Sequence, residues 1–249
     1  MKKIFLGLLA VFATLFTSCE FSETIYVNED GTGKMSLYLD GSDLMPMMGN
    51  KLPIGGEEPI DSIVSFKDVL GKAKFNIANL SKEDQKNIKN LEKLNIHMMV
   101  DANKNKMNFD VFADFNSISD IKGMFEGMEA IGKIAKDRSA MRASDPLAAV
   151  DFDKLTKMDY SYKNNIFKRS FRVLDQKLVD SLKQNLGQAE MLLAASSYKL
   201  DYHFPRKIKS VSLKDAVIGK DGKSFVFEVN VMEFVDNPEI LNFEVELEK

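Results

Sequence analysis

The sequence of 249 residues predicts an α+β fold, in which an antiparallel sheet built from hairpins carries helices packed on one face. Three observations support this prediction. Apolar residues alternate with polar ones over short runs, and these runs come in pairs separated by turn residues. Segments with a helical spacing of apolar residues lie between the pairs, without the strand–helix–strand rhythm of parallel sheets. The composition, 45% hydrophobic and 29% charged, is that of a globular protein.

Three hairpins are predicted in the first two thirds of the chain. The strand pairs are 25–27 with 35–39, 96–100 with 107–115, and 158–162 with 167–173. Turn residues separate the members of each pair: Asp30-Gly31 in the first, Asn103 and Asn105 in the second, and Asn164-Asn165 in the third. Glycine and asparagine accept the positive φ that tight hairpin turns require, so these sites favour chain reversal.

Three more strands and four helices complete the predicted fold. The strands are 198–204, 225–231 and 243–247. Two helices start at capping boxes, Ser81 with Asp84 and Ser117 with Asp120, and a third follows Asp175 and continues to Leu193. Residues 60–71 are predicted as a fourth, shorter helix. Two segments, 41–58 and 137–150, fit neither pattern and are predicted to be long loops, the first either a lid or disordered.

The N-terminus has the layout of a secretory signal peptide. Two lysines follow Met1, residues 4–16 are an apolar run, and small residues precede Cys19. A run of 13 residues is shorter than the 20 or so that a spanning helix needs. The sequence Leu15-Phe16-Thr17-Ser18-Cys19 resembles a bacterial lipobox, with Phe16 in place of the usual aliphatic residue. The alternative is a plain signal peptide followed by an incidental cysteine.

The lipobox resemblance divides the chain into a signal peptide (1–18), a lipidated tether (19–23) and a single α+β domain (24–249). It implies a diacylglyceryl thioether and an amide-linked acyl chain on Cys19, which is the only cysteine. Two or more acyl chains give stable membrane anchoring. Membrane lipid is therefore the first expected partner, and the short tether, at most about 14 Å when extended, keeps the body near the bilayer.

Charge and motif content argue against several other classes of protein. Removal of residues 1–18 leaves 32 basic and 37 acidic residues, a net charge of −5, which argues against a nucleic-acid surface. The chain contains no nucleophile elbow, zinc-protease motif, phosphate-binding glycine loop or cysteine pair. His97 and His203 are expected on the polar faces of strands. We therefore expect no catalytic residues, metal site or cofactor, and no enzyme.

The methionines are the candidate ligand-binding residues. Unbranched, polarisable methionine lines surfaces that adapt to varied apolar partners. The predicted contacts are Met45, Met47, Met48, Met124 and Met128, which would form a groove for an acyl chain or a hydrophobic peptide. The alternative for Met124 and Met128 is an ordinary helix stripe facing the sheet.

A local group of basic residues stands out against the acidic body. Its members are Lys168, Arg169, Arg172, Arg206, Lys207 and Lys209. Such residues either contact anionic headgroups or form a solvated face, and the sequence favours the solvated face.

Two segments carry a resemblance to known lipoproteins. Residues 23–35 contain a hairpin with an Asp-Gly-x-Gly turn a few residues after the predicted anchor, as in bacterial lipoproteins. Residues 198–208, an aromatic-rich strand ending in Phe-Pro, resemble LppM-like lipoprotein domains. The combination is similar to uncharacterised outer-membrane lipoproteins of the Bacteroidetes type. The resemblance implies a lipid- or envelope-related binding role.

Together these observations predict a non-enzymatic envelope lipoprotein that binds a hydrophobic ligand or lipid near the bilayer, on the outer membrane. The alternative is a structural or assembly subunit of an envelope complex, which would contact another envelope protein through an exposed strand edge.

Overall fold

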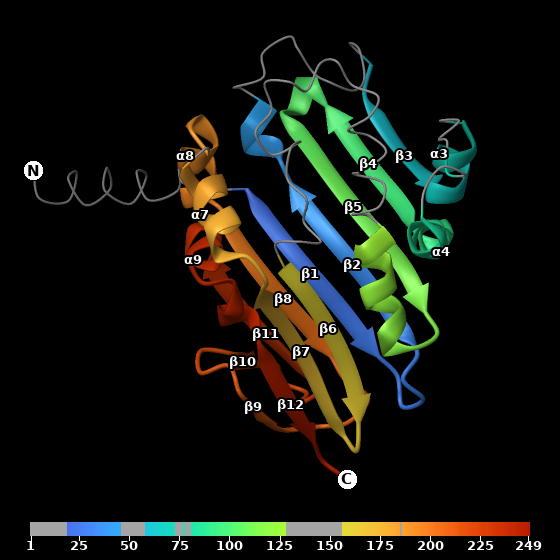
Figure 1. Cartoon of the computed structure of the whole chain (residues 1–249), viewed down its shortest axis with the longest axis vertical. Helices are drawn as coiled ribbons and strands as arrows, with labels where there is room; N and C mark the ends of the chain where they lie inside the picture. The colour runs from blue at the N-terminus through green and yellow to red at the C-terminus, as the bar shows by residue number, and fades with distance from the viewer. Residues whose placement is uncertain (1–18, 46–57, 73–76, 78–80, 128–155, 185) are drawn as a thin grey trace, which may run out of the picture.

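The computed structural model describes residues 19–45, 58–72, 77, 81–127, 156–184 and 186–249, which form two packed β-sheets (Figure 1). The helix of residues 118–127 lies over one face of the large sheet, and the other helices lie at the ends and edges of the sheets. The strands of the first sheet are β1 (Glu20–Val27), β2 (Gly33–Asp40), β3 (Ile60–Ser65), β4 (Asn95–Asp101), β5 (Lys106–Phe115), β8 (Ser197–His203), β10 (Val217–Ile218) and β11 (Ser224–Asn230). The second sheet contains β6 (Thr156–Lys163), β7 (Ile166–Val173), β9 (Ile208–Val211) and β12 (Phe243–Leu247). The α+β prediction is confirmed.

The eight-stranded sheet has the order β10-β11-β8-β1-β2-β5-β4-β3, so that β1 lies near its middle. Neighbouring strands are antiparallel except β1 and β8, which run parallel with Glu20 opposite Ser197. All three predicted hairpins form, and their turns have the expected left-handed residues: Gly31, Asn105, Asn164 and Asn165 have positive φ. The structure differs from the predicted single antiparallel sheet in having a second sheet and one parallel pair.

The four-stranded sheet, in the order β6-β7-β12-β9, covers one face of the large sheet (Figure 1). The core lies between the two sheets and is rich in aromatic rings. Phe167 of β7 and Phe243 of β12 pack against Tyr202 of β8, with ring centroids 5.6 Å and 5.1 Å from that of Tyr202. The opposite face of the large sheet carries mainly polar side chains, as period-two alternation requires when one face is covered.

The helices begin where the sequence places caps. In α4 (Lys82–Asn90) the Ser81 hydroxyl accepts from the Asp84 backbone N–H at 3.0 Å, as the capping box predicts. Residues 118–127 are helical, and Met124 in this helix is buried in the core. The Asp175 carboxylate accepts from the Leu178 backbone N–H at the start of α7 (Gln176–Gln184). The remaining helices are α3 (Phe66–Lys72), α8 (Gln188–Ala194) and α9 (Val231–Asp236).

Two predicted helices are corrected by the structure. Residues 60–65 form the edge strand β3, because they pair with β4, and only residues 66–72 are helical. The single helix predicted after Asp175 is two helices, because Gly187 between them has a φ of +53°, which no right-handed helix accommodates.

The tether predicted over residues 19–23 is also shorter, since β1 begins at Glu20 and its first residues already belong to the sheet. The predicted signal peptide, most of the 41–58 segment and the 137–150 segment lie outside the described residues. Within the described part of the chain, no helix combines the length and apolar character needed to cross a bilayer.

Candidate functional site

The most unusual group of side chains is a buried ion pair between the two sheets. Glu23 on β1 and Arg169 on β7 are 0% and 1% exposed. Each side chain lies on the inward, otherwise apolar face of its strand. The Arg169 Nη2 atom lies 3.1 Å from Glu23 Oε2, and Arg169 Nη1 donates to the Leu241 carbonyl oxygen at 2.9 Å. One charged pair therefore connects the large sheet to the small one.

Three tyrosines complete the coordination of Glu23. Tyr160 donates its hydroxyl to Oε1 at 2.8 Å, and Tyr198 donates to Oε2 at 2.9 Å. The hydroxyl of Tyr202 also donates to Oε1. Tyr160 lies on β6. Tyr198 and Tyr202 are four residues apart on β8, so they lie on the same face of that strand. We call these five residues, Glu23, Arg169, Tyr160, Tyr198 and Tyr202, the buried cluster.

The electrostatics of the buried cluster keep Glu23 charged. Burial by itself raises the pKa of a carboxyl, but the Arg169 guanidinium and the three hydroxyls outweigh it and hold the pKa of Glu23 below its ordinary value. Burial, followed by the charge of Glu23, raises the pKa of Tyr160 and Tyr202, so their hydroxyls remain protonated donors. The arrangement stabilises a carboxylate and does not prepare it to release or accept a proton.

This geometry defines what the buried cluster can do. A general acid or base needs access to the proton it transfers and a pKa near the working pH. Glu23 has neither, because its pKa is lowered and its oxygen atoms are enclosed by its five donor contacts. The buried cluster is therefore a connection between the sheets.

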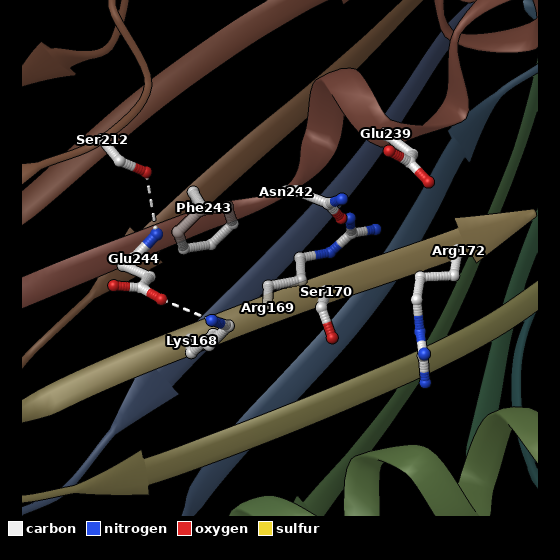
Figure 2. Close-up of a pocket in the computed structure, with 9 residues that line it drawn as sticks. All are labelled: Lys168, Arg169, Ser170, Arg172, Ser212, Glu239, Asn242, Phe243 and Glu244. Atoms are coloured by element: carbon white, nitrogen blue, oxygen red, sulfur yellow. Dashed lines mark hydrogen bonds and ion pairs between the residues drawn. The ribbon is translucent and has the colours of Figure 1, made fainter.

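A hollow of about 600 Å³ lies on the outer face of the four-stranded sheet (Figure 2). Its lining includes Lys168 and Arg172 of β7, Glu244 of β12, and Glu239 and Asn242. The Lys168 ammonium lies 2.5 Å from a Glu244 carboxylate oxygen. The Asn242 amide is used by the backbone of Phe171, with which it makes one bond as donor and one as acceptor. Three cationic side chains, those of Lys168, Arg169 and Arg172, and two carboxylates line the hollow. Because Arg169 is already paired with Glu23 and Lys168 with Glu244, the hollow selects neither charge strongly.

A smaller hollow of about 330 Å³ lies on the polar face of the large sheet. Tyr26 and Phe112 supply aromatic rings to its lining, and Lys34, Asp110 and Asp114 supply charges. Asp110 accepts from the Ser36 hydroxyl at 2.6 Å, and Lys34 lies 3.8 Å from Asp114. These polar groups contact one another as well as solvent.

The predicted anchor residue, Cys19, lies directly before β1. Its carbonyl oxygen accepts from the Ser197 backbone N–H at 3.1 Å, which fixes it beside the start of β8. The side chain is 7% exposed in the unprocessed chain, and burial raises the pKa of its thiol. Lipidation of Cys19 stays a prediction.

The candidate methionines do not form one group among the described residues. Met45 packs with Val100 and Met107 in a small buried cluster, whereas Met124 is fully buried in the main core. Met47, Met48 and Met128 lie outside the described residues. The burial of Met124 is what a helix stripe facing the sheet requires, and a methionine-lined site stays a prediction.

The basic group predicted on one surface is divided by the structure. Arg169 belongs to the buried cluster, and Arg206 makes a bidentate pair with Glu29, in which Nε donates to Oε1 and Nη2 to Oε2. On the outer face of the small sheet, Lys168 pairs with Glu244 and Lys209 with Glu246. Most of these cations therefore have an acidic partner.

The two histidines lie on the polar face of the large sheet. His97 Nε2 is 2.7 Å from Asp61, and His203 stacks on Tyr26 with ring centroids 4.2 Å apart. Across the described ranges, no three His, Cys, Asp or Glu side chains are placed to hold a metal ion.

The sequence reasoning missed the roles of Glu23 and Arg169, although a signal for both was present. Glu23 is in phase with Ile25 and Val27, and Arg169 is in phase with Phe167 and Phe171. One acid and one base on apolar strand faces, in different hairpins, indicate a buried pair. The three tyrosines are likewise in phase with apolar residues.

Two packed sheets joined by a buried ion pair, with helices between and beside the strands, thus define the class of this protein as an α+β domain. No family model and no curated protein sequence matches the chain. A solved structure that is similar is the NMR structure of the folded domain of LppM from Mycobacterium tuberculosis. It is 7% identical, with a TM-score of 0.37, and the match covers 94% of this chain and 95% of that domain.

Proposed function

We propose that this chain is a lipoprotein of the bacterial cell envelope, anchored through lipid on Cys19, whose body acts by binding and not by catalysis. The observation that carries the proposal is the place of Cys19. The residue that ends the lipobox-like sequence is also the residue immediately before a central strand of the sheet. Cleavage before Cys19 would therefore leave the described fold complete.

The chemistry of the described residues supports a non-enzymatic role. The fully buried carboxylate, Glu23, is saturated by donors and shut away from any substrate. The histidines at positions 97 and 203 lie next to carboxylates on an open sheet face, and no described residue pairs them with a nucleophile. The described residues assemble no such catalytic group, which suits a protein that works by contact.

The ligand we propose is hydrophobic, an acyl chain or a lipid taken up near the bilayer, and the membrane we propose is the outer membrane. The predicted contacts are Met45, Met47, Met48, Met124 and Met128. Because Met45 and Met124 are buried, contact with a ligand requires the side chains that cover them to move.

Fractionation and mass spectrometry test both parts of this proposal. We expect the wild-type protein to sediment with membranes and Cys19→Ser to appear in the soluble periplasmic fraction. Unchanged membrane association of Cys19→Ser contradicts the anchor. We also expect a bound lipid to be recovered from Cys19→Ser purified without detergent, because that variant carries no lipid of its own. Recovery of no lipid contradicts the hydrophobic ligand.

One observation favours assembly with another envelope protein as the second candidate function. The edge strand β3 pairs only with β4 among the described residues, and it carries an Ile63 side chain that is 63% exposed. Edge strands with few charges are templates for pairing with another chain. Ile63→Lys should abolish cross-linking to such a partner, while Val217→Lys on the two-residue strand β10 should not. Equal cross-linking in both variants contradicts an assembly role for β3.

A further inference from the structure

One end of the molecule carries large apolar side chains that remain exposed. Leu174, which follows β7, is 55% exposed, and Leu178 in α7 is 37% exposed. Met191 in α8 is 79% exposed, an extreme value for a large apolar side chain. Isolated exposed leucines are ordinary on protein surfaces. These three side chains therefore indicate a contact surface only if they lie at the same part of the molecule.

Helices α7 and α8 lie at the end of the large sheet where β1 begins, and Leu174 is in the short link from β7 to α7 (Figure 1). Helix α8 runs into Ser196 and Ser197, and the Ser197 backbone N–H donates to the Cys19 carbonyl oxygen at 3.1 Å. Helix α9 contacts both other helices. Asn230, its N-cap, donates to the Ala194 carbonyl oxygen of α8 at 2.8 Å, and Asp236 lies 3.0 Å from Lys183 of α7. The three helices and Cys19 thus form one end of the body.

The chain leaves no spacer between this end and the proposed lipid. Cys19 is followed directly by Glu20, the first residue of β1. One extended residue spans at most about 3.6 Å, so lipid on Cys19 holds the start of β1 within a few ångströms of the glycerol backbone. Since β1 is near the middle of the eight-stranded order, the whole end must face the bilayer.

We propose that the end formed by α7 and α8 lies in the interfacial region of the bilayer, with Leu174, Leu178 and Met191 among the upper acyl segments. The inference rests on the proposed anchor and adds the surface that contacts lipid. Apolar side chains on short amphipathic helices gain from this transfer out of water, as in interfacial helices generally. The anchor would then fix the orientation of the body as well as its location.

The charges at this end favour an apolar contact with lipid. Lys177 and Lys183 are outnumbered by Asp175, Asp180 and Glu190 on the same segment, so attraction to anionic headgroups does not drive the contact. The basic side chains on the outer face of the small sheet, Lys168 and Lys209, lie outside this helical segment and are paired with Glu244 and Glu246. The experiment therefore uses neutral lipid.

Fluorescence quenching by lipid tests the orientation. The chain has one cysteine, and lipidation converts its sulfur to a thioether, so an introduced cysteine is the only free thiol. The full-length lipidated protein carrying Leu178→Cys or Met191→Cys is labelled with a fluorophore and placed in phosphatidylcholine vesicles with brominated acyl chains. Ile166→Cys and Val217→Cys are matched controls, because both native side chains are exposed and apolar. Ile166 lies at the opposite end of β7, about 26 Å from Leu174.

We expect a loss of emission at positions 178 and 191 and no loss at positions 166 and 217. Equal emission at all four positions, in protein that floats with the vesicles, overturns the proposed orientation and leaves the anchor intact. Failure of the lipidated protein to float overturns the anchor and the orientation together. As a second measurement, Met191→Ser with Leu178→Ser should remove the protection of α8 amides against hydrogen exchange in vesicles, while Val217→Ser should leave it unchanged. Unchanged protection in the double variant also contradicts the proposal.

Discussion

Lys168 and Arg169 are neighbours on β7, and each faces a carboxylate, but on opposite sides of the four-stranded sheet. Lys168 meets Glu244 on the outer face, where both side chains are 52% exposed. Arg169 meets Glu23 between the sheets, where both are almost fully buried. Water screens the two charges of the outer pair and solvates each of them if the pair breaks. The two charges of the inner pair are cut off from water and depend on their protein partners. An ion pair is therefore expected to contribute little to stability at Lys168, and the loss of one partner is expected to cost much more at the neighbouring Arg169.

The largest effect is expected from removing one charge of the inner pair. Arg169→Met leaves a buried carboxylate without its cation, and it should lower the free energy of unfolding by about 3–5 kcal/mol. Lys168→Ala is the matched control on the same strand and should cost about 0–1 kcal/mol. Urea unfolding of the detergent-solubilised lipidated protein measures both. Similar losses in the two variants would contradict the contrast between the faces of β7.

A double substitution then separates the charge from the packing. Glu23→Gln alone leaves Arg169 unpaired, but Glu23→Gln with Arg169→Met removes both charges and keeps an amide oxygen as acceptor for the tyrosine hydroxyls. We expect the double variant to lose less stability than the sum of the two single losses, with a coupling of about 1–3 kcal/mol. Losses that simply add would mean that the two side chains do not act as a pair.

A smaller loss is expected from removing one hydroxyl. Tyr202→Phe deletes a donor to the Glu23 carboxylate, and hydrogen bonds to charged groups contribute about 1.5–3 kcal/mol. Tyr26→Phe is the control, because Tyr26 is exposed on the polar face of the large sheet. Thermal unfolding of the two variants measures the difference. A Tyr202→Phe protein as stable as Tyr26→Phe would show that Arg169, Tyr160 and Tyr198 satisfy Glu23 without the third hydroxyl.

The smallest effect is a dependence of stability on acid. The pKa of Glu23 is lowered in the folded protein, so its contribution is present above the unfolded glutamate pKa of about 4.3 and is lost as the pH falls through the folded pKa. One carboxyl contributes at most about 1.4 kcal/mol per pH unit in that window. Glu23→Gln should flatten this part of the stability curve. Parallel curves for the two proteins would contradict a charged Glu23.

Local patterns predicted most strands, because alternation and turn residues act over a few neighbours. The hairpins around Gly31, Asn105 and Asn164 form as expected. The prediction of a helix over residues 60–65 is wrong because a short run containing Ile60, Ile63 and Val64 fits either the helix or the strand period. Pairing with β4 makes it a strand. The break at Gly187 could have been predicted from the sequence, because glycine is the residue that most readily adopts a positive φ and often ends a helix.

Contacts between distant segments were not predictable in the same way. The parallel pairing of β1 with β8 joins Glu20 to Ser197, and no local pattern specifies that neighbour. The second sheet is not predicted for the same reason. Alternation identifies the buried face of a strand but not the surface that covers that face. The sequence contains a signal for the members of the buried cluster but not for their contact. Glu23 and Arg169 were each out of place on an apolar face, but their meeting depends on the packing of the two sheets.

The mass of the N-terminal peptide shows whether the mature protein begins at a lipidated Cys19. The protein is recovered from membranes of cells that express the full chain, digested, and analysed by mass spectrometry. We expect a peptide that begins at Cys19 and carries a diacylglyceryl group on sulfur and an acyl chain on its amino group. A mature peptide that begins at another residue, or one with a free Cys19 thiol, would rule out the lipid anchor.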